Sequence, residues 1–242
     1  MSVTHDYFLG GKIVVAQPRH GFRAGVDSVM LAAAVPAQKG ESVLDMGCGA
    51  GVALACLNAR VGGLKLFGLE IQAELATLAA HNVPGAVIIN HDITQKVGLR
   101  EKFHHIMINP PFYMTQKNMP KKNASKKISN HMAEEDIALW VMAAKKLLRA
   151  KGYVTMIVPV SVSMLWIRHL AQCFGDIRLL PLWPHAGEAA KRVLLRARVG
   201  GMGPSVLLPG LVLHEADGRY TVGAQKILGE GAPIFESEAD DA

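Results

Sequence analysis

The run Asn109-Pro110-Pro111-Phe112 is the sharpest chemical feature of the sequence, and it follows an apolar segment expected to form a strand. The two prolines stiffen the turn and remove backbone donors, so the Asn109 side-chain carbonyl and the Pro110 backbone carbonyl stay free to accept hydrogen bonds. Two fixed acceptors match the two hydrogens of one NH2 group. Holding both hydrogens draws the nitrogen lone pair out of conjugation, so the turn predicts group transfer to a planar exocyclic amine.

Two aromatic residues follow the prolines. Phe112 would stack on a planar substrate, and stacking on a base taken out of its strand contributes about 1–3 kcal/mol in proteins that bind single strands. Tyr113 could assist or simply pack. A rigid turn that only ends a strand is the structural alternative. A proline pair between an asparagine and two aromatics nevertheless favours a catalytic role.

A glycine-rich loop with the sequence Asp45-Met-Gly47-Cys-Gly49-Ala-Gly51 joins a predicted strand to a predicted helix. Its glycines let the backbone approach a ligand closely. In a nicotinamide-binding domain, such a loop would cradle pyrophosphate at the start of the helix, but Asp45 would then put a carboxylate close to the phosphates. Asp45 instead suits a cofactor with a cationic ammonium group.

Two further acidic residues lie at the end of a predicted strand or just past it. Glu70 lies about twenty residues past the loop, where a carboxylate can accept hydrogen bonds from ribose hydroxyls. Asp92 falls at the same edge of the expected sheet and could accept from an adenine amine. The structural alternatives are a favourable helix start for Glu70 and an ordinary turn residue for Asp92.

A group of lysines directly follows the proline turn and supplies much of the net charge of +6. Its position, more than its charge, suggests contacts with phosphates that flank an extruded base. A solvated loop is the alternative, since many basic proteins never bind nucleic acid. The lysines are Lys117, Lys121, Lys122, Lys126 and Lys127.

From Ser42 onward, short apolar strands alternate with helical segments, which is typical of βαβ units in a parallel sheet. The predicted fold is therefore a Rossmann-like α/β domain whose seven-stranded sheet is mostly parallel, with an antiparallel last strand. The predicted strands are 43–46, 64–70, 86–90, 104–108, 153–158, 177–182 and 192–198, and the predicted helices are 52–59, 72–82, 134–149 and 162–174.

The two ends of the chain are expected to add smaller elements. Gly10-Gly11 predicts a tight hairpin, and Asp27 could cap a buried helix over 28–35. The resulting organisation is a hairpin and helix over 1–35 that belong to the main domain, the domain proper over 36–200, and an extension over 201–242. The acidic last residues are expected to be disordered.

Composition and residue spacing limit the class of protein to which the chain can belong. Hydrophobic residues make up 50% of the chain, which excludes a disordered protein, and the apolar runs are too interrupted to span a bilayer. The N-terminal residues lack the features of a secretory signal, so a cytoplasmic protein is expected. Three cysteines without C-x-x-C spacing predict free thiols. His104 and His105 would point to opposite faces of a strand, so no metal site is predicted.

In combination, these motifs resemble the seven-stranded methyltransferases, in which D-x-G-x-G-x-G binds S-adenosylmethionine and N-P-P-F/Y accepts the target amine. Within that superfamily the sequence looks like the bacterial tRNA(Val) adenine-N6 methyltransferase family, which shares the N-terminal Gly-Gly hairpin and a Phe-Arg-x-x-x-Asp-Ser-x-x-Leu-like stretch, here Phe22 to Leu31. The resemblance covers about Phe8 to Arg198. The matching residues are Asp45, Gly47, Gly49, Gly51, Glu70, Asp92 and Asn109 to Phe112.

The resemblance implies an S-adenosylmethionine-dependent enzyme that methylates an adenine in tRNA at N6, without a metal or a membrane partner. It also implies that Arg23 and Asp27 lie over the cofactor pocket, where Asp27 could contact the methionyl ammonium or cap its helix. The oligomeric state stays open.

Three other functions are compatible with the same motifs. Glutamine-N5 methyltransferases use a similar proline turn for a side-chain amide, although they usually carry a longer helical N-terminal domain. Guanine-N2 methyltransferases of ribosomal RNA are a second rival within the enzyme class. A protein that binds RNA on this fold without catalysis is the rival from another class, because fold alone does not establish function.

Overall fold

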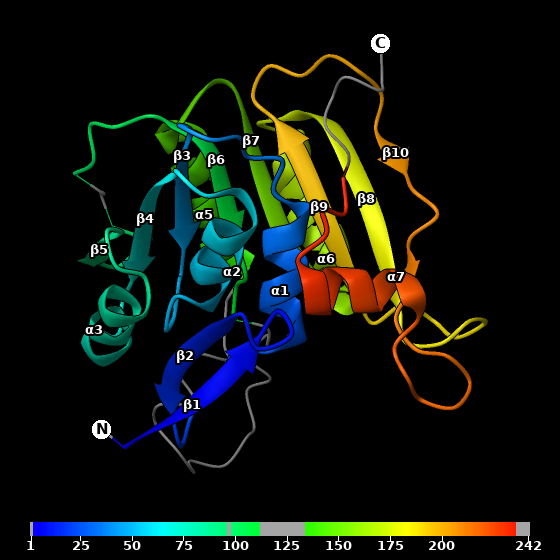
Figure 1. Ribbon diagram of the computed structural model, residues 1–242. Helices are drawn as coiled ribbons and strands as arrows, with labels where there is room; N and C mark the ends of the chain where they lie inside the picture. Colours follow the sequence, from blue (N-terminus) through cyan, green and yellow to red (C-terminus); the bar gives the residue numbers. More distant parts are fainter. Residues whose placement is uncertain (1, 96–97, 112–133, 236–242) are drawn as a thin grey trace, which may run out of the picture.

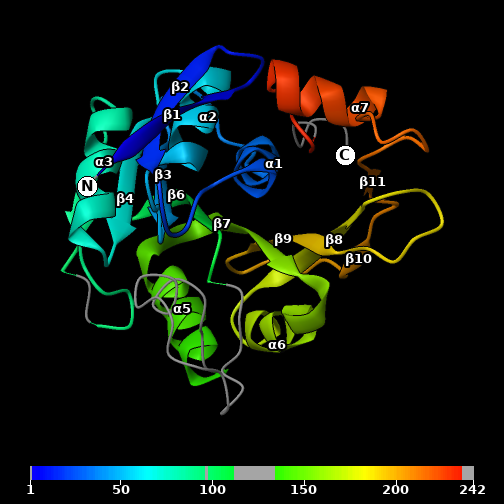
Figure 2. The same cartoon turned by 90° about the horizontal axis from the view of Figure 1, so that it is seen from below.

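The computed structural model describes residues 2–95, 98–111 and 134–235 of the chain. In this described part, one central sheet separates two groups of helices, which gives three layers (Figure 1 and Figure 2). The strand order is β10-β8-β9-β7-β6-β3-β4-β5, and β11 also pairs with β8. A separate two-stranded hairpin, β1-β2, precedes the first helix.

The chain alternates between strands and helices over most of its length, as predicted. The hairpin strands are β1 (Val3–Phe8) and β2 (Ile13–Pro18), and the strands of the central sheet are β3 (Ser42–Met46), β4 (Lys65–Glu70), β5 (Val87–Asn90), β6 (Phe103–Ile108), β7 (Leu148–Pro159), β8 (Gly175–Trp183), β9 (Arg192–Arg198), β10 (Val206–Leu207) and β11 (Leu211–Val212). The helices are α1 (Val26–Ala34), α2 (Val52–Val61), α3 (Ala73–Asn82), α5 (Glu134–Leu147), α6 (Val160–Ala171), α7 (Val222–Gln225) and the π-helical turn η1 (Lys226–Glu230).

The direction of the strands fixes where a ligand can bind. Strands β3, β4, β5, β6 and β7 run parallel to one another, and β9 is antiparallel to both β7 and β8. This confirms the predicted mostly parallel sheet with an antiparallel last strand. The carboxyl ends of β3, β4, β5 and β6 therefore meet at one edge, which is where open α/β sheets collect ligands.

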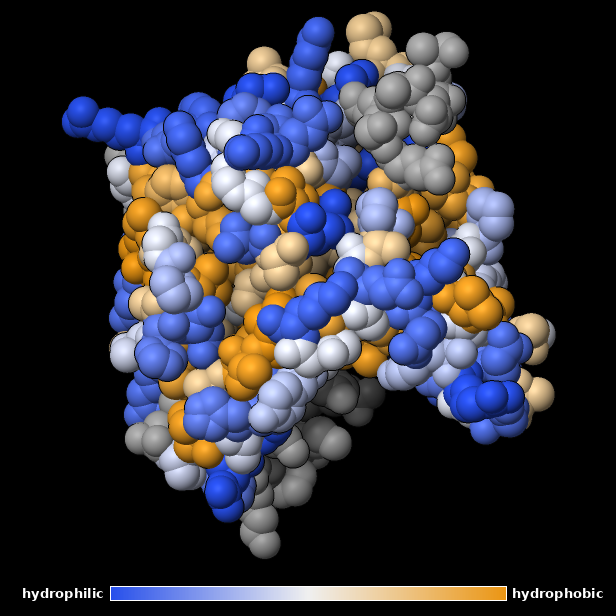
Figure 3. Space-filling view, viewed as in Figure 1, coloured by the Kyte–Doolittle hydropathy of each residue, from blue (hydrophilic) through white to orange (hydrophobic). Residues whose placement is uncertain are grey.

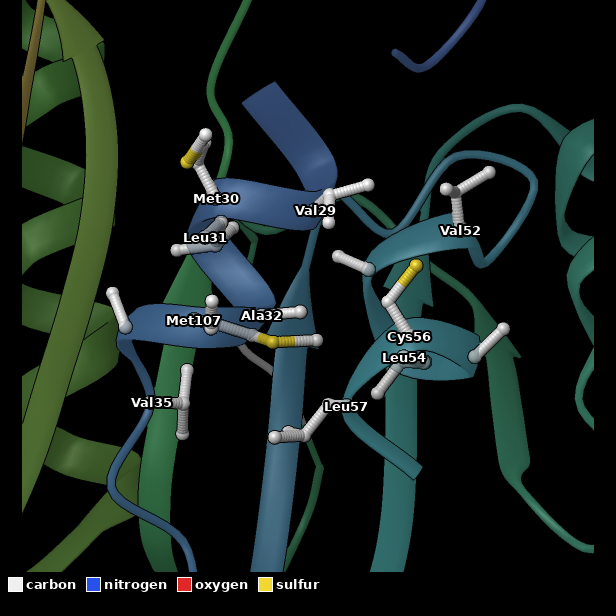
Figure 4. Close-up of a cluster of buried hydrophobic side chains, with 14 of the residues drawn as sticks. Val29, Met30, Leu31, Ala32, Val35, Val52, Leu54, Cys56, Leu57 and Met107 are labelled. Atoms are coloured by element: carbon white, nitrogen blue, oxygen red, sulfur yellow. The ribbon is translucent and has the colours of Figure 1, made fainter. Parts of the chain in front are cut away.

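One face of the sheet is covered by α1, α2 and α3. Successive residues of a strand point to opposite faces, so Val43 and Met107 belong to this side while Leu44 and Ile106 belong to the other. Helix α1 is buried over almost its whole length, as predicted, because it lies between the sheet, α2 and η1. Figure 4 shows side chains of α1 and α2 meeting Met107 from β6.

The opposite face is covered by α5 and α6. Trp140 and Val141 of α5 and Trp166 of α6 pack on Leu44, Ile106 and other residues of the strands. Both helices carry a buried stripe at helical spacing. The same stripe positions the amino-terminal end of α5 at the ligand-binding edge.

The hairpin is anchored to the domain by Asn82, the last residue of α3. The Asn82 side chain accepts a hydrogen bond from the Ala16 amide at 3.0 Å and donates to the Ala16 carbonyl at 2.8 Å. It also donates to the carbonyl of Ala50 in the glycine loop at 2.9 Å. One amide group thus joins the hairpin, α3 and the loop.

Replacing Asn82 by alanine should lower the free energy of unfolding by about 1–3 kcal/mol, because buried backbone groups lose their partners. Urea unfolding of the two proteins measures the difference. Asn58→Ala, on the exposed side of α2, is the matched control and should change stability by less than about 0.5 kcal/mol. Equal losses in the two variants would contradict the anchoring role of Asn82.

The residues after Gly200, predicted as an extension without assigned elements, add short strands and helical turns to the fold. Strands β10 and β11 pair with the free edge of β8, and η1 packs on α1. The described sheet consequently has nine strands, and not the seven predicted. Two-residue strands carry too little sequence signal to be predicted, since they depend on the neighbouring strand for every hydrogen bond. The acidic end, from 236, lies outside the described residues.

Two local predictions were wrong. Gly25, and not Asp27, is the N-cap of α1, and no side chain caps that helix. The helix predicted over 134–149 ends earlier, at Leu147, because β7 already begins at Leu148 and passes through an irregular stretch in which Lys151 has a φ of 62°. Pairing of Leu148 with Phe103 of β6 overrides the helical pattern there. In the described residues, no helix has the length and apolarity needed to cross a membrane.

Candidate active site

A cavity of about 330 Å³ opens at the carboxyl edge of β3, β4, β5 and β6. It collects residues from the loops that follow these four strands, together with side chains from the hairpin side and from α5. Its lining comprises Phe22, Gly47, Gly49, Glu70, Ile71, Gln72, Leu75, His91, Asp92, Ile93, Thr94, Asn109, Pro110, Pro111, Asp136 and Trp140. A smaller hollow shares part of this wall and adds Asp45, Gln17 and Ser28.

The glycine loop takes backbone conformations that side chains disfavour. Gly47, Gly49 and Gly51 have φ angles of 80°, 55° and 83°. A Cβ atom on Gly47 would lie 3.0 Å from the ring of Trp140, whereas one on Gly49 would have no heavy atom closer than 3.9 Å. Gly47 therefore permits the contact with α5, and Gly49 leaves open space on the cavity side of the loop.

Glu70 fastens this loop to the end of β4. One carboxylate oxygen accepts from the Gly49 amide at 2.9 Å, and the other accepts from the Gln72 amide at 2.9 Å. Burial raises the pKa of Glu70, although these backbone hydrogen bonds oppose the rise. Glu70 is thus a buried acceptor with lone pairs left for a ligand in the cavity.

Asp45 lies deeper, at the end of β3, and is only 2% exposed. Burial, together with the neighbouring Glu70 carboxylate, raises the pKa of Asp45 to about 8. The same surroundings raise the pKa of the adjacent Cys48 thiol, first through burial and then through Asp45 and Glu70. A cation placed in the hollow would stabilise the ionised form of Asp45.

Asp92 follows β5 in an Asx turn. One of its carboxylate oxygens accepts from the amide of Thr94 at 2.9 Å and from the hydroxyl of Thr94 at 2.8 Å. The alternative interpretation of Asp92 as a turn residue is therefore correct, and its place in the cavity wall is compatible with the predicted ligand contact as well.

Asn109 carries the most informative observation in the site. Its side-chain oxygen is buried, and no partner for it is found among the described residues. Such an acceptor is costly to leave unpaired, by about 1–3 kcal/mol. Pro110 is buried next to it, and Pro111 completes this wall of the cavity. A donor is expected to occupy the space in front of Asn109.

Several predicted substrate residues fall outside the described part of the chain. These are Phe112, Tyr113, Lys117, Lys121, Lys122, Lys126 and Lys127.

Arg23 and Asp27 do not line either cavity. Arg23 forms a two-pronged ion pair with Asp6 of β1 and also donates to Thr4 at 2.8 Å. Asp27 accepts from Arg192 of β9 at 2.8 Å. Both residues tie the segment around Phe22 to its surroundings, so the structure gives them positions beside the site and not in its wall.

Several wall residues were missed by the sequence analysis, among them Phe22, His91, Asp136 and Trp140. Phe22 approaches Gly49 from the hairpin side, and the buried Nε2 of His91 has no partner among the described residues. Asp136 and Trp140 face the cavity from α5. Their spacing of one helical turn was available as a signal, but it does not reveal that this end of α5 reaches the sheet edge.

The charge of the cavity restricts the ligand. The described walls of the two hollows include the carboxylates Asp45, Glu70, Asp92 and Asp136, but no lysine or arginine. Together with Phe22 and Trp140, they suit a ligand that combines a cationic group with flat rings. A dinucleotide pyrophosphate would meet repulsion here.

The usual metal ligands do not cluster in the described part of the chain. Within the described ranges, no group of three or more His, Cys, Asp or Glu residues could hold one. His105 pairs with Glu41 at 2.9 Å, and His104 contacts the Ser42 hydroxyl at 2.9 Å.

A family model described as the methyltransferase small domain matches residues 23–180. Among curated relatives, a tRNA1(Val) (adenine(37)-N6)-methyltransferase of Dyadobacter fermentans is 24% identical over 88% of this chain and 90% of the relative. The enzyme of the same description from Dickeya chrysanthemi is 26% identical over 88% of each chain.

Solved structures support the same fold. A predicted O-methyltransferase from Agrobacterium tumefaciens superposes with a TM-score of 0.71 at 21% identity, covering 86% of this chain and 98% of the other. A 16S rRNA N2 G1207 methyltransferase from T. thermophilus, solved with AdoMet and guanosine, has a TM-score of 0.57 at 18% identity, covering 82% of this chain and 50% of that one.

Proposed function

Because the chain belongs to the methyltransferase small domain family, we propose that it transfers a methyl group from S-adenosylmethionine to the N6 amine of an adenine in tRNA. The observation that carries the chemistry is the unpaired, buried acceptor of Asn109 in the cavity wall. The relatives named as tRNA adenine-N6 methyltransferases, which align over most of the chain, favour the choice of substrate.

The cavity residues fit S-adenosylmethionine, which supplies an activated methyl group when it is bound. Glu70 accepts hydrogen bonds from ribose hydroxyls, and Asp92 accepts from the adenine amine of the cofactor. Asp45 lies where an ammonium group would neutralise it. Gly47, Gly49 and Gly51 allow the loop to approach closely, while Arg23 and Asp27 hold the segment around Phe22 against this pocket.

The target amine is held by the proline turn. The Asn109 side chain and the Pro110 carbonyl accept its two hydrogens, which favours the developing positive charge on nitrogen and orients its lone pair. Pro111 keeps the turn rigid, and Phe112 stacks on the extruded base. Tyr113 and the lysines Lys117, Lys121, Lys122, Lys126 and Lys127 contact the RNA around that base.

Cofactor binding should depend on pH through Asp45. Its pKa of about 8 means that the carboxyl is mostly protonated at pH 7, and an ammonium group favours the ionised form. Binding should therefore release a proton, and affinity should rise by up to about tenfold per pH unit until pH approaches 8.

The folding stability of the protein without cofactor should change with pH in the opposite direction. Asp45 ionises at a lower pH in the unfolded chain than in the folded protein, so its contribution to folding stability falls as pH rises from about 4 to 8.

Calorimetry in two buffers with different ionisation enthalpies measures the proton release. Asp45→Asn is the control. Because Glu70 also has a raised pKa, only the part of the proton release that comes from Asp45 should vanish in this variant. Binding by the unchanged protein without proton release at pH 7 would contradict the role given to Asp45.

The proposed reaction can be tested with isotopically labelled S-adenosylmethionine, offered with total RNA and, in parallel, with total protein. Nucleoside analysis should recover the label as N6-methyladenosine in tRNA. Label on a glutamine side chain or on N2 of guanine would replace the proposed substrate, and cofactor binding without any transfer would favour a non-catalytic RNA-binding role.

A further inference from the structure

The edge of the sheet opposite the cavity is strongly basic. Strands β3, β4, β6 and β7 begin there, and hydrophilic residues gather along this upper edge in Figure 3. Many exposed cations lie among the described residues of this edge. They come just before these strands, from the first residues of the strands, and from the end of α5. We call this set the basic edge: Lys39, Lys65, Arg100, Lys102, Lys145, Lys146, Arg149 and Lys151.

The members of the basic edge lie close to one another although they come from separate segments. Lys102 donates to the carbonyl of Lys146, which joins the start of β6 to the end of α5. Lys39 packs beside Gly63, two residues before Lys65. Four adjacent strands separated by about 4.8 Å give the edge a width of about 14 Å.

The positive field of this edge reaches its histidines. Burial lowers the pKa of His104, and Arg149 and Lys65 lower it further, while only Glu41 opposes them. The carboxylate of Glu41 is already engaged by His105 and by the Gln38 amide. Lys151 extends the edge from a backbone with φ of 62°, a conformation that is uncommon for residues other than glycine.

Glu41 and Glu101 lie among these cations and offset only part of their charge. The remaining positive charge needs an explanation, since like charges at this spacing repel and weaken folding. Binding of a polyanion would neutralise these charges and relieve the repulsion. It is favoured because lysines and arginines replace the counterions of the polyanion, which are released into solution. A partner with regularly spaced phosphates matches a stripe that crosses four strands. The cations of the basic edge thus lie on a face that the catalytic site does not use.

We propose that the basic edge binds the phosphate backbone of folded RNA, at a segment separate from the one that presents the target base. Strand β6 separates the two sites, because it runs from Phe103 at the basic edge to Ile108 before Asn109, about 20 Å away. The two edges face in opposite directions, so one short strand of RNA does not contact both. The inference rests on the proposed function only in taking RNA as the polyanion.

The test removes three charges without disturbing the strands. Lys65→Gln, Arg149→Gln and Lys151→Asn are combined, since asparagine tolerates the left-handed backbone at 151. Binding of a fully paired RNA duplex is measured against salt concentration, without cofactor or methyl transfer. The triple variant should bind at least about tenfold more weakly, and the slope of log affinity against log salt should fall by about two to three.

The matched control, Lys12→Gln combined with Arg219→Gln and Lys226→Gln, removes the same charge from exposed sites away from this edge. It should keep most of the affinity. Equal losses in the two triple variants would show that only the total charge matters and would overturn the proposal. So would an unchanged salt slope in the basic-edge variant, or failure of the unchanged protein to bind the duplex, even if methyl transfer to single-stranded RNA proceeds.

A second readout does not depend on substitutions. Titration of His104 by NMR should show its pKa rising when duplex RNA is added, because the negative charge of bound phosphates opposes the positive charge of Arg149 and Lys65.

A competition experiment distinguishes RNA from an anionic membrane surface. Vesicles of phosphatidylcholine and phosphatidylserine are added as the competing anionic surface. Displacement of the RNA from the basic edge by these vesicles at equal phosphate concentration would overturn the assignment to RNA, and an unchanged His104 pKa would do the same.

Discussion

Replacing Asn109 by alanine is expected to slow methyl transfer by about a hundredfold to a thousandfold, the loss typical of removing one preorganised hydrogen-bonding group from an active site. The substitution removes the acceptor that is buried without a described partner in the cavity wall. Affinity for S-adenosylmethionine should stay nearly unchanged, because Glu70 and the glycine loop remain. Single-turnover rates and calorimetry measure the two quantities separately.

Asn109→Asp is the matched control for this substitution. It preserves the shape of the side chain and an acceptor oxygen at the same position, so it should retain more activity than the alanine variant. If the alanine variant turned over at the original rate, Asn109 would have no part in the transfer. If it lost cofactor binding to the same degree, the residue would have a structural role instead.

The second large effect is expected at Glu70. The two Glu70 carboxylate oxygens now accept hydrogen bonds from the backbone amides of Gly49 and Gln72. In Glu70→Gln, one of these two amides would face the NH2 group of the new side chain and lose its acceptor. Leaving one donor unpaired in a buried position and weakening the ribose contact should together cost about 3 kcal/mol, or about a hundredfold in cofactor affinity. Calorimetry at a fixed pH measures the loss.

Glu74→Gln removes the same charge from the exposed first turn of α3 and should bind cofactor normally. Cofactor affinity that is equal in the two variants would contradict the role of Glu70. Comparison of urea unfolding for the same pair identifies any part of the loss that comes from a disordered loop.

Much of the site could be predicted because it follows from strand direction. Glu70 ends a predicted strand, and Gly47, Asp92 and Asn109 each follow one within two residues; parallel strands place such residues at one edge. Local chemistry was sufficient in these cases, since the glycines and prolines determine their own backbone conformations.

The rest depends on contacts between distant segments. Asp27 looks like a helix cap in sequence, but it pairs with Arg192, which is 165 positions away. Trp140 reaches the glycine loop only because α5 packs on the face of the sheet opposite α1 and α2. The basic edge is likewise invisible in sequence, because its lysines and arginines come from separate segments that only the sheet brings together.

The central claim, N6-methylation of adenine in tRNA by the Asn109 turn, is tested most directly in cells that lack the gene. Their purified tRNA is digested to nucleosides and analysed by mass spectrometry, with and without restored expression of the unchanged protein or of Asn109→Ala. We predict that N6-methyladenosine is lost, returns with the unchanged protein and does not return with the variant. Unaltered N6-methyladenosine in the deleted strain, or full restoration by Asn109→Ala, would contradict the claim.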